Sequence, residues 1–283
     1  MEIKSLEHTP VEEILQTLNL AFSDYFVPIN FTLDYVNERW KASGVNYTLS
    51  FGVFDDNRLV GFIIHAINFY KDSKVAYNAS TGIIPTYRKK GLLTKLYEKA
   101  IPALKENGIQ KSTLEVITKN ERAILAYQKV GFKIDRHYKL YKFDWIKSEA
   151  KFQIETTFKI KITNHFYFED FKHLQNYIPS LENQNHCLEL LKKNLISITV
   201  FDKKEMVAYL LFHQISKRIH RLGVKENDWN YYGEILFSGL ETGNYNIINI
   251  DTANENIHNF FKDMNFENYI DQYDMSLHFD FAQ

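Results

Sequence analysis

The sequence has one cysteine, Cys187, among 283 residues, so it cannot form an internal disulfide, and this scarcity fits a reducing cytoplasm. Long apolar runs are also missing, because no segment approaches the roughly 18 residues that a membrane-spanning helix needs. The first residues, MEIKSLEHTPVEE, lack the apolar stretch of a signal peptide. We therefore expect a cytoplasmic protein without a membrane partner.

Excess charge of either sign is absent as well. The chain has 34 Lys and Arg residues against 35 Asp and Glu residues, and its formal net charge is -1. No global field attracts nucleic acid, so we expect no nucleic-acid partner. Hydrophobic residues make up 45% and aromatic residues 15% of the chain, which argues for packed cores and against disorder. At about 100–200 residues per domain, the length predicts two domains.

Helix-type and strand-type segments alternate in the first half of the chain. Ile14, Leu18 and Phe22 recur at helical spacing after Pro10, for example. The sequence predicts helices over 10–26, 32–44, 91–108 and 120–131. It predicts single strands over 3–8, 73–84, 111–118 and 132–145, and two strands over 47–70 that are joined by a polar turn at Asp55–Asn57. Helices interleaved with strands are typical of an α/β layer fold.

The segment GIIPTYRKKGLLTKL (82–96) places three cations directly before Gly91, where a helix begins. Cations are unfavourable at a helix N-terminus, so the segment indicates that something negative binds there. Unpaired N–H groups at the helix start, beside a glycine, would form a cradle for phosphate. For the tripeptide alone, a solvated surface cluster is the alternative. The segment is neither a Walker loop nor a dinucleotide fingerprint, because it lacks the glycines and the Gly-Lys-Ser/Thr that those motifs require.

Two pieces of residues 1–145 together resemble the GCN5-related N-acetyltransferases (GNAT). Arg88-Lys89-Lys90-Gly91-Leu92-Leu93 is similar to the family's Q/R-x-x-G-x-G/A, with Leu93 where Gly or Ala is usual. The other piece is Leu114-Glu115-Val116 followed by NERAILAYQKVGF (120–132). The resemblance implies that acetyl-coenzyme A binds as co-substrate, with its pyrophosphate at the cationic segment and its pantetheine arm along GIIP. The binding residues that it implies are Ile83, Ile84, Arg88, Lys89, Lys90, Gly91, Leu92, Leu93, Thr94, Asn120, Ala123 and Tyr127.

The same resemblance implies two catalytic residues. Tyr127 is the expected acid for the departing thiolate, since a phenol with a pKa near 10 keeps its proton at pH 7; core packing is its alternative role. Glu115 is the expected base that helps deprotonate the amine, directly or through water, and an exposed strand carboxylate is the alternative. His65 is a second candidate base, although a histidine in an apolar strand is more often structural. Asn120 is expected to contact the cofactor, cap a helix, or both.

The second half of the chain repeats the first in weakened form. FDDNRLVGFIIH (54–65) is echoed by FDKKEMVAYLLF (201–212), and LEVITKNERAILAYQKVGF (114–132) by INIDTANENIHNFFKDMNF (248–266). Val60 and Val207 are 147 positions apart, whereas Asn120 and Asn254 are 134 apart. The second copy is therefore 13 residues shorter between its third and fifth strands.

The second copy has also lost the residues that carry chemistry. Phe261 stands where Tyr127 does, Asn265 where Gly131 does, and Asn249 where Glu115 does. No Arg-x-x-Gly precedes its helix candidate WNYYGEILFSGL. We therefore expect a degenerate copy that binds no cofactor.

The pattern of elements predicts an α/β protein with two copies of one fold. The resemblance implies that these are two tandem acyl-CoA N-acyltransferase (GNAT) folds, each a mixed, mostly antiparallel sheet flanked by helices. Residues 1–147 are the expected catalytic domain and 148–283 the degenerate one, with a junction in DWIKSEAKFQ (144–153). The activity that the resemblance implies moves an acetyl group from acetyl-CoA to a primary amine by direct attack, with no acyl-enzyme and no metal. A non-catalytic acetyl-CoA sensor or an interaction module is the alternative.

The sequence leaves the acceptor amine and the oligomeric state open. A homodimer is one option for the latter. Aromatic residues of the first two helices and the last strand are expected either to wall the acceptor site or to belong to the core; they are Tyr25, Phe26, Tyr35 and Tyr138.

Overall fold

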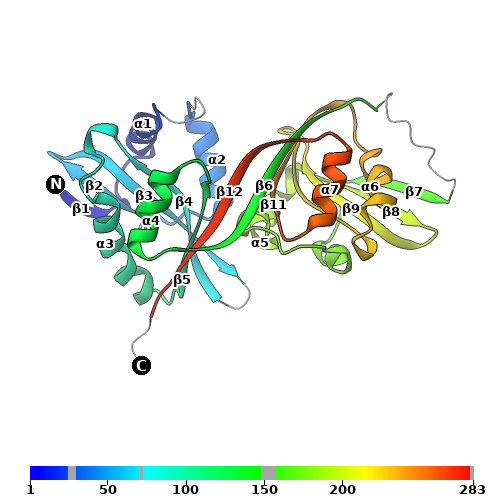
Figure 1. Cartoon of the computed structure of the whole chain (residues 1–283). Helices are drawn as coiled ribbons and strands as arrows, with labels where there is room; N and C mark the ends of the chain where they lie inside the picture. The colour runs from blue at the N-terminus through cyan, green and yellow to red at the C-terminus, as the bar shows by residue number, and fades with distance from the viewer. Residues whose placement is uncertain (25–29, 71–72, 148–156, 281–283) are drawn as a thin grey trace. The chain divides into compact units, whose positions relative to one another are not determined.

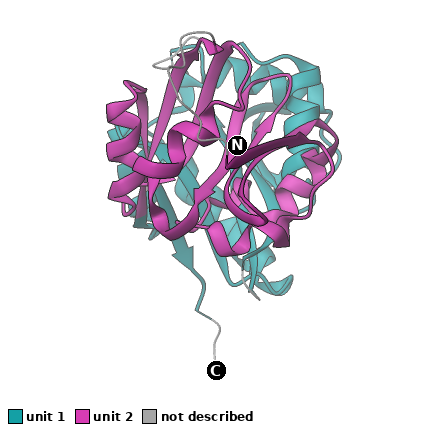
Figure 2. Cartoon of the chain, turned by 90° about the vertical axis from the view of Figure 1, so that its right-hand side faces the viewer, with its two compact units in different colours: residues 1–135, 274–283 teal, residues 136–273 magenta. Residues whose placement is uncertain are grey.

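The computed structural model describes residues 1–24, 30–70, 73–147 and 157–280. The chain divides into two compact units, which Figure 2 shows in separate colours. Unit 1 consists of residues 1–135 and 274–283, and unit 2 consists of residues 136–273. Both are built from strands and helices, so the predicted α/β class is confirmed.

Unit 1 is a sheet in the order β1-β2-β3-β4-β5, with the end of the last strand of the chain beside β5. The short 3-10 helix η1 (Pro85–Tyr87) connects β4 to α3. Its strands (Figure 1) are β1 (Glu2–Ser5), β2 (Phe51–Asp55), β3 (Arg58–Tyr70), β4 (Ser73–Ile83) and β5 (Lys111–Ile117). Its helices are α1 (Val11–Ala21), α2 (Leu33–Ser43), α3 (Leu92–Glu106) and α4 (Glu121–Val130).

Helices cover both faces of this sheet. Ile14 of α1 and Trp40 of α2 are buried with Ile64 of β3 in one apolar cluster. The next strand residue, His65, points to the opposite face because side chains alternate along a strand. There its ring meets the ring of Tyr97 from α3, with centroids 6.1 Å apart. Helices α1 and α2 therefore cover one face of the sheet, and α3 and α4 cover the other. We refer to these as the α1 face and the α3 face.

The helix boundaries follow the capping residues that the sequence contains. Thr32 accepts a hydrogen bond from the backbone N–H of Tyr35 at the start of α2, and Gly44 ends that helix with φ = 75°. Asn120 caps the start of α4 in the same way, and Gly131 ends it with φ = 114°. A glycine adopts such positive φ angles without the strain that a Cβ atom brings.

Unit 2 is a sheet in which β12 and β6 are followed by β11, β10, β9, β8 and β7. Its aromatic core includes Phe143 and Phe266, whose rings stack with centroids 3.9 Å apart. The strands are β6 (Lys133–Trp145), β7 (Phe158–Thr163), β8 (Leu195–Asp202), β9 (Glu205–His213), β10 (Arg218–Val224), β11 (Gly243–Asp251) and β12 (Glu267–His278). The helices are α5 (Asn185–Leu191), α6 (Trp229–Phe237) and α7 (Glu255–Asp263).

The predicted repeat is visible in local geometry. The hairpins β2–β3 and β8–β9 each carry a register shift directly before the equivalent residues Phe54 and Phe201. The helices α4 and α7 are both capped by an asparagine, since Asn254 accepts from the backbone N–H of Ile257 as Asn120 does from that of Ala123. Matching bulges and caps at matching sequence positions confirm two copies of one fold.

In each sequence copy, the strand that follows the last helix leaves the compact unit that holds the rest of that copy. From Arg136 onward β6 belongs to unit 2, where it pairs with β11. In return β12 reaches unit 1 at Asp274 and runs beside β5, and the N–H of Phe279 donates to the carbonyl of Gln110 at 2.9 Å. The sequence pattern had placed residues 132–145 in the first copy. Compact units and sequence copies therefore differ, and the boundary at 147/148 stays a prediction about copies. Residues 148–153 of the expected junction lie outside the described residues.

The shortening of the second copy is spread over several elements. Strands β3 and β4 have 13 and 11 residues, whereas their counterparts β9 and β10 have 9 and 7. Helix α3 has 15 residues and α6 has 9. The lost residues thus come from the central hairpin as well as from the region that corresponds to the cationic segment.

Candidate functional site

Strands β4 and β5 of unit 1 run parallel but separate part way along their length. They pair only where residues 75–77 face residues 111–113. Beyond these positions β4 continues to Ile83 and β5 to Ile117. Backbone groups along the two diverging edges are thereby offered to a ligand that enters between the strands.

The cationic segment lies directly after the open edge of β4. Gly91 has φ = 70° and is exposed, and no atom comes within 4 Å of the position that a Cβ would occupy. No side chain among the described residues caps α3, and its first intrahelical bond runs from the N–H of Lys95 to the carbonyl of Gly91. The N–H groups of residues 92–94 thus have no partner within the helix. These groups, with open space beside them, fit the pyrophosphate of a coenzyme A derivative.

The side chain of Arg88 is held by the protein itself. Its terminal nitrogens donate to both carboxylate oxygens of Asp24, at 2.7 and 2.8 Å, and to the carbonyl of Ala21 at 2.7 Å. Its Nε donates to the carbonyl of Ile83 at 3.1 Å. This guanidinium therefore ties the end of α1 to the end of β4. The exposed cations of the segment are Lys89, whose φ is 62°, and Lys90, whose Nζ lies 4.7 Å from the centre of the Tyr87 ring.

The residues expected along the pantetheine arm lie at the end of β4. Ile84 donates its backbone N–H to the carbonyl of Val60 on β3 at 3.0 Å. Since neighbouring residues of a strand direct their backbone groups to opposite edges, those of Ile83 face the open edge toward β5. The Ile83 carbonyl already accepts from Arg88, so its N–H is the group left for a ligand.

Helix α4 begins directly after Asn120, where the sequence predicts a helix start. The side-chain oxygen of Asn120 accepts from the N–H of Ala123 at 3.2 Å, so the capping role of Asn120 is established. One turn later the same helix brings Tyr127 to the sheet. Its side chain is buried, and Asn78 of β4 donates to its hydroxyl at 3.5 Å. Phe132 packs edge-on against the Tyr127 ring, with centroids 5.6 Å apart.

Glu115 and Tyr127 approach the opening from opposite faces of the sheet. Asn78, which bonds Tyr127, shares the α3 face with its partner residue His65. Tyr77 precedes Asn78 and therefore points to the α1 face. The half-buried carboxylate of Glu115 accepts a hydrogen bond from the Tyr77 hydroxyl there. A carboxylate on one face and a phenol on the other thus flank the opening between β4 and β5.

His65 is unsuited to act as the base. It is fully buried, and its Nδ1 bonds the carbonyl of Leu49 at 2.7 Å. Burial lowers its pKa from 6.5 to about 4, with the Leu49 carbonyl opposing that shift. Its role is the structural alternative that the sequence pattern left open.

Several site residues lay beyond the sequence motifs. Asp24 bonds Arg88 and Asn78 bonds Tyr127, contacts that span 64 and 49 positions in sequence. Tyr97 and Thr81 join the site through their bonds to Asn78. The closely spaced polar residues Asn78, Ser80 and Thr81 in a predicted strand were the available signal. Of the proposed aromatic wall, Tyr25 and Phe26 lie outside the described residues, Tyr138 is fully buried, and Tyr35 stacks on Phe31 with centroids 5.7 Å apart.

The corresponding opening in unit 2 is filled by the chain itself. Strands β10 and β11 pair only where residues 218–219 face residues 246–247, so they separate as β4 and β5 do. The side chain of Asn176 bonds both the N–H and the carbonyl of Val224 at the end of β10, each at 2.8 Å. A Cβ on Gly223 would lie 2.0 Å from the carbonyl oxygen of Leu174. Residues 174–176 therefore occupy the edge that is open in unit 1.

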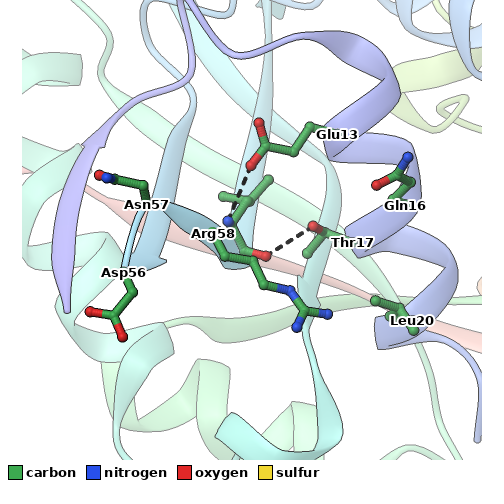
Figure 3. Close-up of a pocket in the computed structure, with 8 residues that line it drawn as sticks. Glu13, Gln16, Thr17, Leu20, Asp56, Asn57 and Arg58 are labelled. Carbon is green, nitrogen blue, oxygen red and sulfur yellow. Dashed lines mark hydrogen bonds between the residues drawn. The ribbon is translucent and has the colours of Figure 1, made fainter.

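The pocket in Figure 3 is a separate feature of unit 1. It lies between α1 and the β2–β3 turn and is lined by Glu13, Gln16, Thr17, Leu20, Asp56, Asn57, Arg58 and Leu59. Glu13 accepts from the N–H of Leu59 at 3.2 Å, and Thr17 donates to the Leu59 carbonyl at 3.1 Å. These bonds hold α1 to the hairpin. The lining shares no residue with the site between β4 and β5.

Within the described ranges, no three His, Cys, Asp or Glu side chains gather in a way that could hold a metal ion. No helix in the described part of the chain is long and apolar enough to cross a membrane.

Comparisons with known proteins agree with this geometry. The model of the acetyltransferase (GNAT) family matches residues 13–132. N-alpha-acetyltransferase 30 of Schizosaccharomyces pombe is 30% identical over 137 residues, which are 48% of this chain and 85% of the relative. N-alpha-acetyltransferase MAK3 of Arabidopsis thaliana is 31% identical over 84 residues, which are 30% of this chain and 44% of the relative.

Among solved structures, a tandem GNAT protein from the clavulanic acid biosynthesis pathway matches 100% of this chain with 99% of its own. The TM-score is 0.73 and the sequence identity 10%, so this likeness concerns the fold. It covers both copies, whereas the family model and the curated relatives match about half of the chain or less. The chain therefore belongs to the acetyltransferase (GNAT) family, as an acyltransferase with two GNAT folds in tandem.

Proposed function

We propose that unit 1 transfers the acetyl group of acetyl-CoA to a primary amine by direct attack of the amine, without an acyl-enzyme. The observation that carries this proposal is the separation of β4 and β5 beside the unpaired N–H groups at the start of α3. The opening suits a pantetheine arm and the helix start suits a pyrophosphate. Family membership supports acetyl-CoA as the donor.

The backbone is the main phosphate ligand in this proposal. The N–H groups of residues 92–94 bind the pyrophosphate, and the exposed Lys89 and Lys90 add positive charge. Arg88 contributes indirectly, because its bonds to Asp24 and to the Ile83 carbonyl fix the shape of the segment. Ile83, Ile84 and the first turn of α4, with Asn120 and Ala123, line the remainder of the slot.

Tyr127 and Glu115 divide the proton transfers. Acetyl-CoA supplies the acetyl group as a thioester. Glu115, directly or through water, takes a proton from the amine, whose nitrogen forms the new bond to the carbonyl carbon as the carbon–sulfur bond breaks. Tyr127 gives its phenolic proton to the departing sulfur. The two residues act from opposite faces of the sheet, so the amine and the thiol do not compete for one group.

The acceptor that we propose is the α-amino group of a peptide or protein. Two relatives of the first half of the chain carry the name N-alpha-acetyltransferase, and one of them is matched over 85% of its length. An α-amino group has a pKa of about 7.7–8.0, so a sizeable neutral fraction is present at pH 7 and a modest base suffices.

The second copy, residues 148–283, is proposed to be catalytically silent. Asn176 already bonds the N–H and carbonyl of Val224 that a ligand would need, and Phe261 stands in place of Tyr127. Phe261 is fully buried in the aromatic core of unit 2, where its ring lies 4.9 Å from that of Tyr141. Catalysis is assigned to the first copy, residues 1–147.

The test is a thiol-release assay of the full chain with acetyl-CoA and a panel of amines. We expect rapid release with peptides that have a free α-amino group, and only background release with the same peptides already acetylated at the N-terminus. Release with lysine side chains or small amines alone would overturn the acceptor assignment. If the chain binds acetyl-CoA but no amine leads to thiol release, the protein is an acetyl-CoA sensor and not an enzyme.

A further inference from the structure

A buried asparagine connects Tyr127 to the core of unit 1. Asn78 lies on β4 directly after the last residue that pairs with β5, at a register shift in the pairing with β3. Its Nδ2 donates to the Tyr97 hydroxyl at 2.9 Å and to the Tyr127 hydroxyl at 3.5 Å. Its Oδ1 accepts from the hydroxyl of Thr81 at 2.9 Å. Both ends of this amide are thus engaged at the point where the strands separate.

The bonding pattern gives this amide a direction. Because Oδ1 receives the Thr81 proton, the nitrogen end of Asn78 faces the two phenols. Each phenol oxygen then accepts a hydrogen bond from the Asn78 amide, and the hydroxyl proton of Tyr127 is directed to another partner. Tyr97 is fully buried. Burial is the main reason why the pKa of Tyr97 lies well above 10, and the nearby Tyr127 raises it further. Tyr97 therefore stays neutral and does not compete for the negative charge.

We propose that Asn78, oriented by Thr81, is a positioning residue that makes Tyr127 a proton donor toward the opening between β4 and β5. A hydrogen bond donated to a phenol oxygen stabilises the phenolate that remains after proton transfer. It also keeps the phenol from turning its proton into the core. The proposal rests on the acid role of Tyr127 given under Proposed function.

The requirement for an asparagine follows from the geometry. Aspartate has the same shape, but when ionised it only accepts hydrogen bonds, so it would draw the Tyr127 proton inward. Leucine has a similar volume and supplies neither bond. Thr81→Val removes the hydroxyl that fixes the amide, whereas Thr81→Ser retains it.

The experiment is a double-variant cycle on the full chain with Asn78→Leu and Tyr127→Phe. We expect Asn78→Leu to lower kcat about 3- to 10-fold, the worth of one hydrogen bond, with the KM for acetyl-CoA unchanged. In the Tyr127→Phe background the same change should have no further effect on kcat. Asn78→Asp should lower kcat at least as much as Asn78→Leu. The kcat of Thr81→Ser should be near that of the wild type, and the kcat of Thr81→Val should lie between those of the wild type and Asn78→Leu.

A second measurement tests the role of Asn78 even if no acceptor is found. The pKa of Tyr127, followed by NMR on chain labelled at the tyrosine Cζ, should rise in Asn78→Leu. The matched control is Asn68→Leu, which removes another buried strand amide, bonded to the carbonyl of Ser43 at 3.2 Å, and should leave that pKa unchanged.

Three results separate the claims. An inactive wild type contradicts the proposed function but leaves the NMR result to decide the role of Asn78. Wild-type turnover in Tyr127→Phe contradicts the acid. Equal losses from Asn78→Leu in both backgrounds, or an unchanged Tyr127 pKa, overturns the positioning role.

Discussion

Arg88 and Gly91 of the cationic segment have different physical roles. Arg88 is enclosed by Asp24 and by two backbone carbonyls, so its charge is already compensated. Gly91, three positions on, is exposed in open space with a positive φ. In the proposed site, the backbone beside Gly91 is therefore the expected contact for a ligand phosphate, rather than the guanidinium.

Gly91→Asp and Gly91→Asn form a matched pair that tests this assignment. Both side chains tolerate a left-handed backbone to a similar degree, and both have the same size. Only aspartate places a negative charge beside the expected pyrophosphate, where like charges repel. Calorimetry should show that Gly91→Asp abolishes acetyl-CoA binding, whereas Gly91→Asn retains much more of it. Equal affinities in the two variants would refute a phosphate cradle at this residue.

Tyr127→Phe tests the acid at the level of a single oxygen atom. If Tyr127 protonates the leaving thiolate, kcat should fall by roughly 10²–10⁴ because general acid catalysis is lost. The affinity for acetyl-CoA should change little, since the ring keeps its packing against Phe132. Steady-state kinetics under conditions where chemistry limits the rate decide the matter, and an unchanged kcat would assign Tyr127 to packing alone.

Local chemistry in the sequence was enough to predict Asn120 as a cap and Gly91 at the start of a helix, because both depend on neighbours within four residues. The enclosure of Arg88 by Asp24 was not predictable in this way. That contact spans 64 positions and depends on how α1 packs on the sheet. Asn78 was missed for the same reason, since its partners lie on α3 and α4.

At the scale of elements, the Asp24–Arg88 pair connects the end of α1 to the turn between β4 and α3. The hydrogen bond from Arg88 holds the pKa of Asp24 below its ordinary value of 3.8, although burial opposes this shift. Both side chains are partly exposed, at 33% for Arg88 and 52% for Asp24. Solvent therefore weakens the pair, and we assign it about 0.2–1 kcal/mol of unfolding free energy.

Asp24→Asn should remove that stability near neutral pH. Because the folded-state pKa of Asp24 is lowered, its contribution is present above pH 3.8 and is lost as the pH falls through the folded pKa. Denaturant unfolding at several pH values should show a difference between wild type and Asp24→Asn that vanishes in acid. A difference of the same size at every pH would mean that the ion pair is not its source. Acetyl-CoA affinity should fall less than in Gly91→Asp.

Helices and strands were easier to predict from the sequence than the pairing of the strands. Hairpins and capped helices depend on short-range patterns, and both copies show them where the sequence indicated. The exchange of β6 and β12 was not predicted, because the same alternation of side chains allows either strand to pair with either sheet edge.

At the scale of the whole molecule, the exchange makes the two copies depend on each other. A fragment of residues 1–147 would lose residues 274–280, which run beside β5, and would keep β6 without β11. Its exposed strand edge would favour aggregation. We expect this fragment to be poorly soluble and to have little activity compared with the full chain, as measured by size-exclusion chromatography and thiol release. A soluble fragment with full activity would mean that β6 can close unit 1 by itself.

The central claim is that the opening between β4 and β5 is the acetyl-CoA site and that its counterpart in unit 2 is closed by residues 174–176. Calorimetric titration of the full chain with acetyl-CoA tests it most directly, with Gly91→Asp as the control for unit 1. The account predicts one acetyl-CoA per chain in the wild type and none in Gly91→Asp. Two acetyl-CoA per chain, or one that persists in Gly91→Asp, would contradict it.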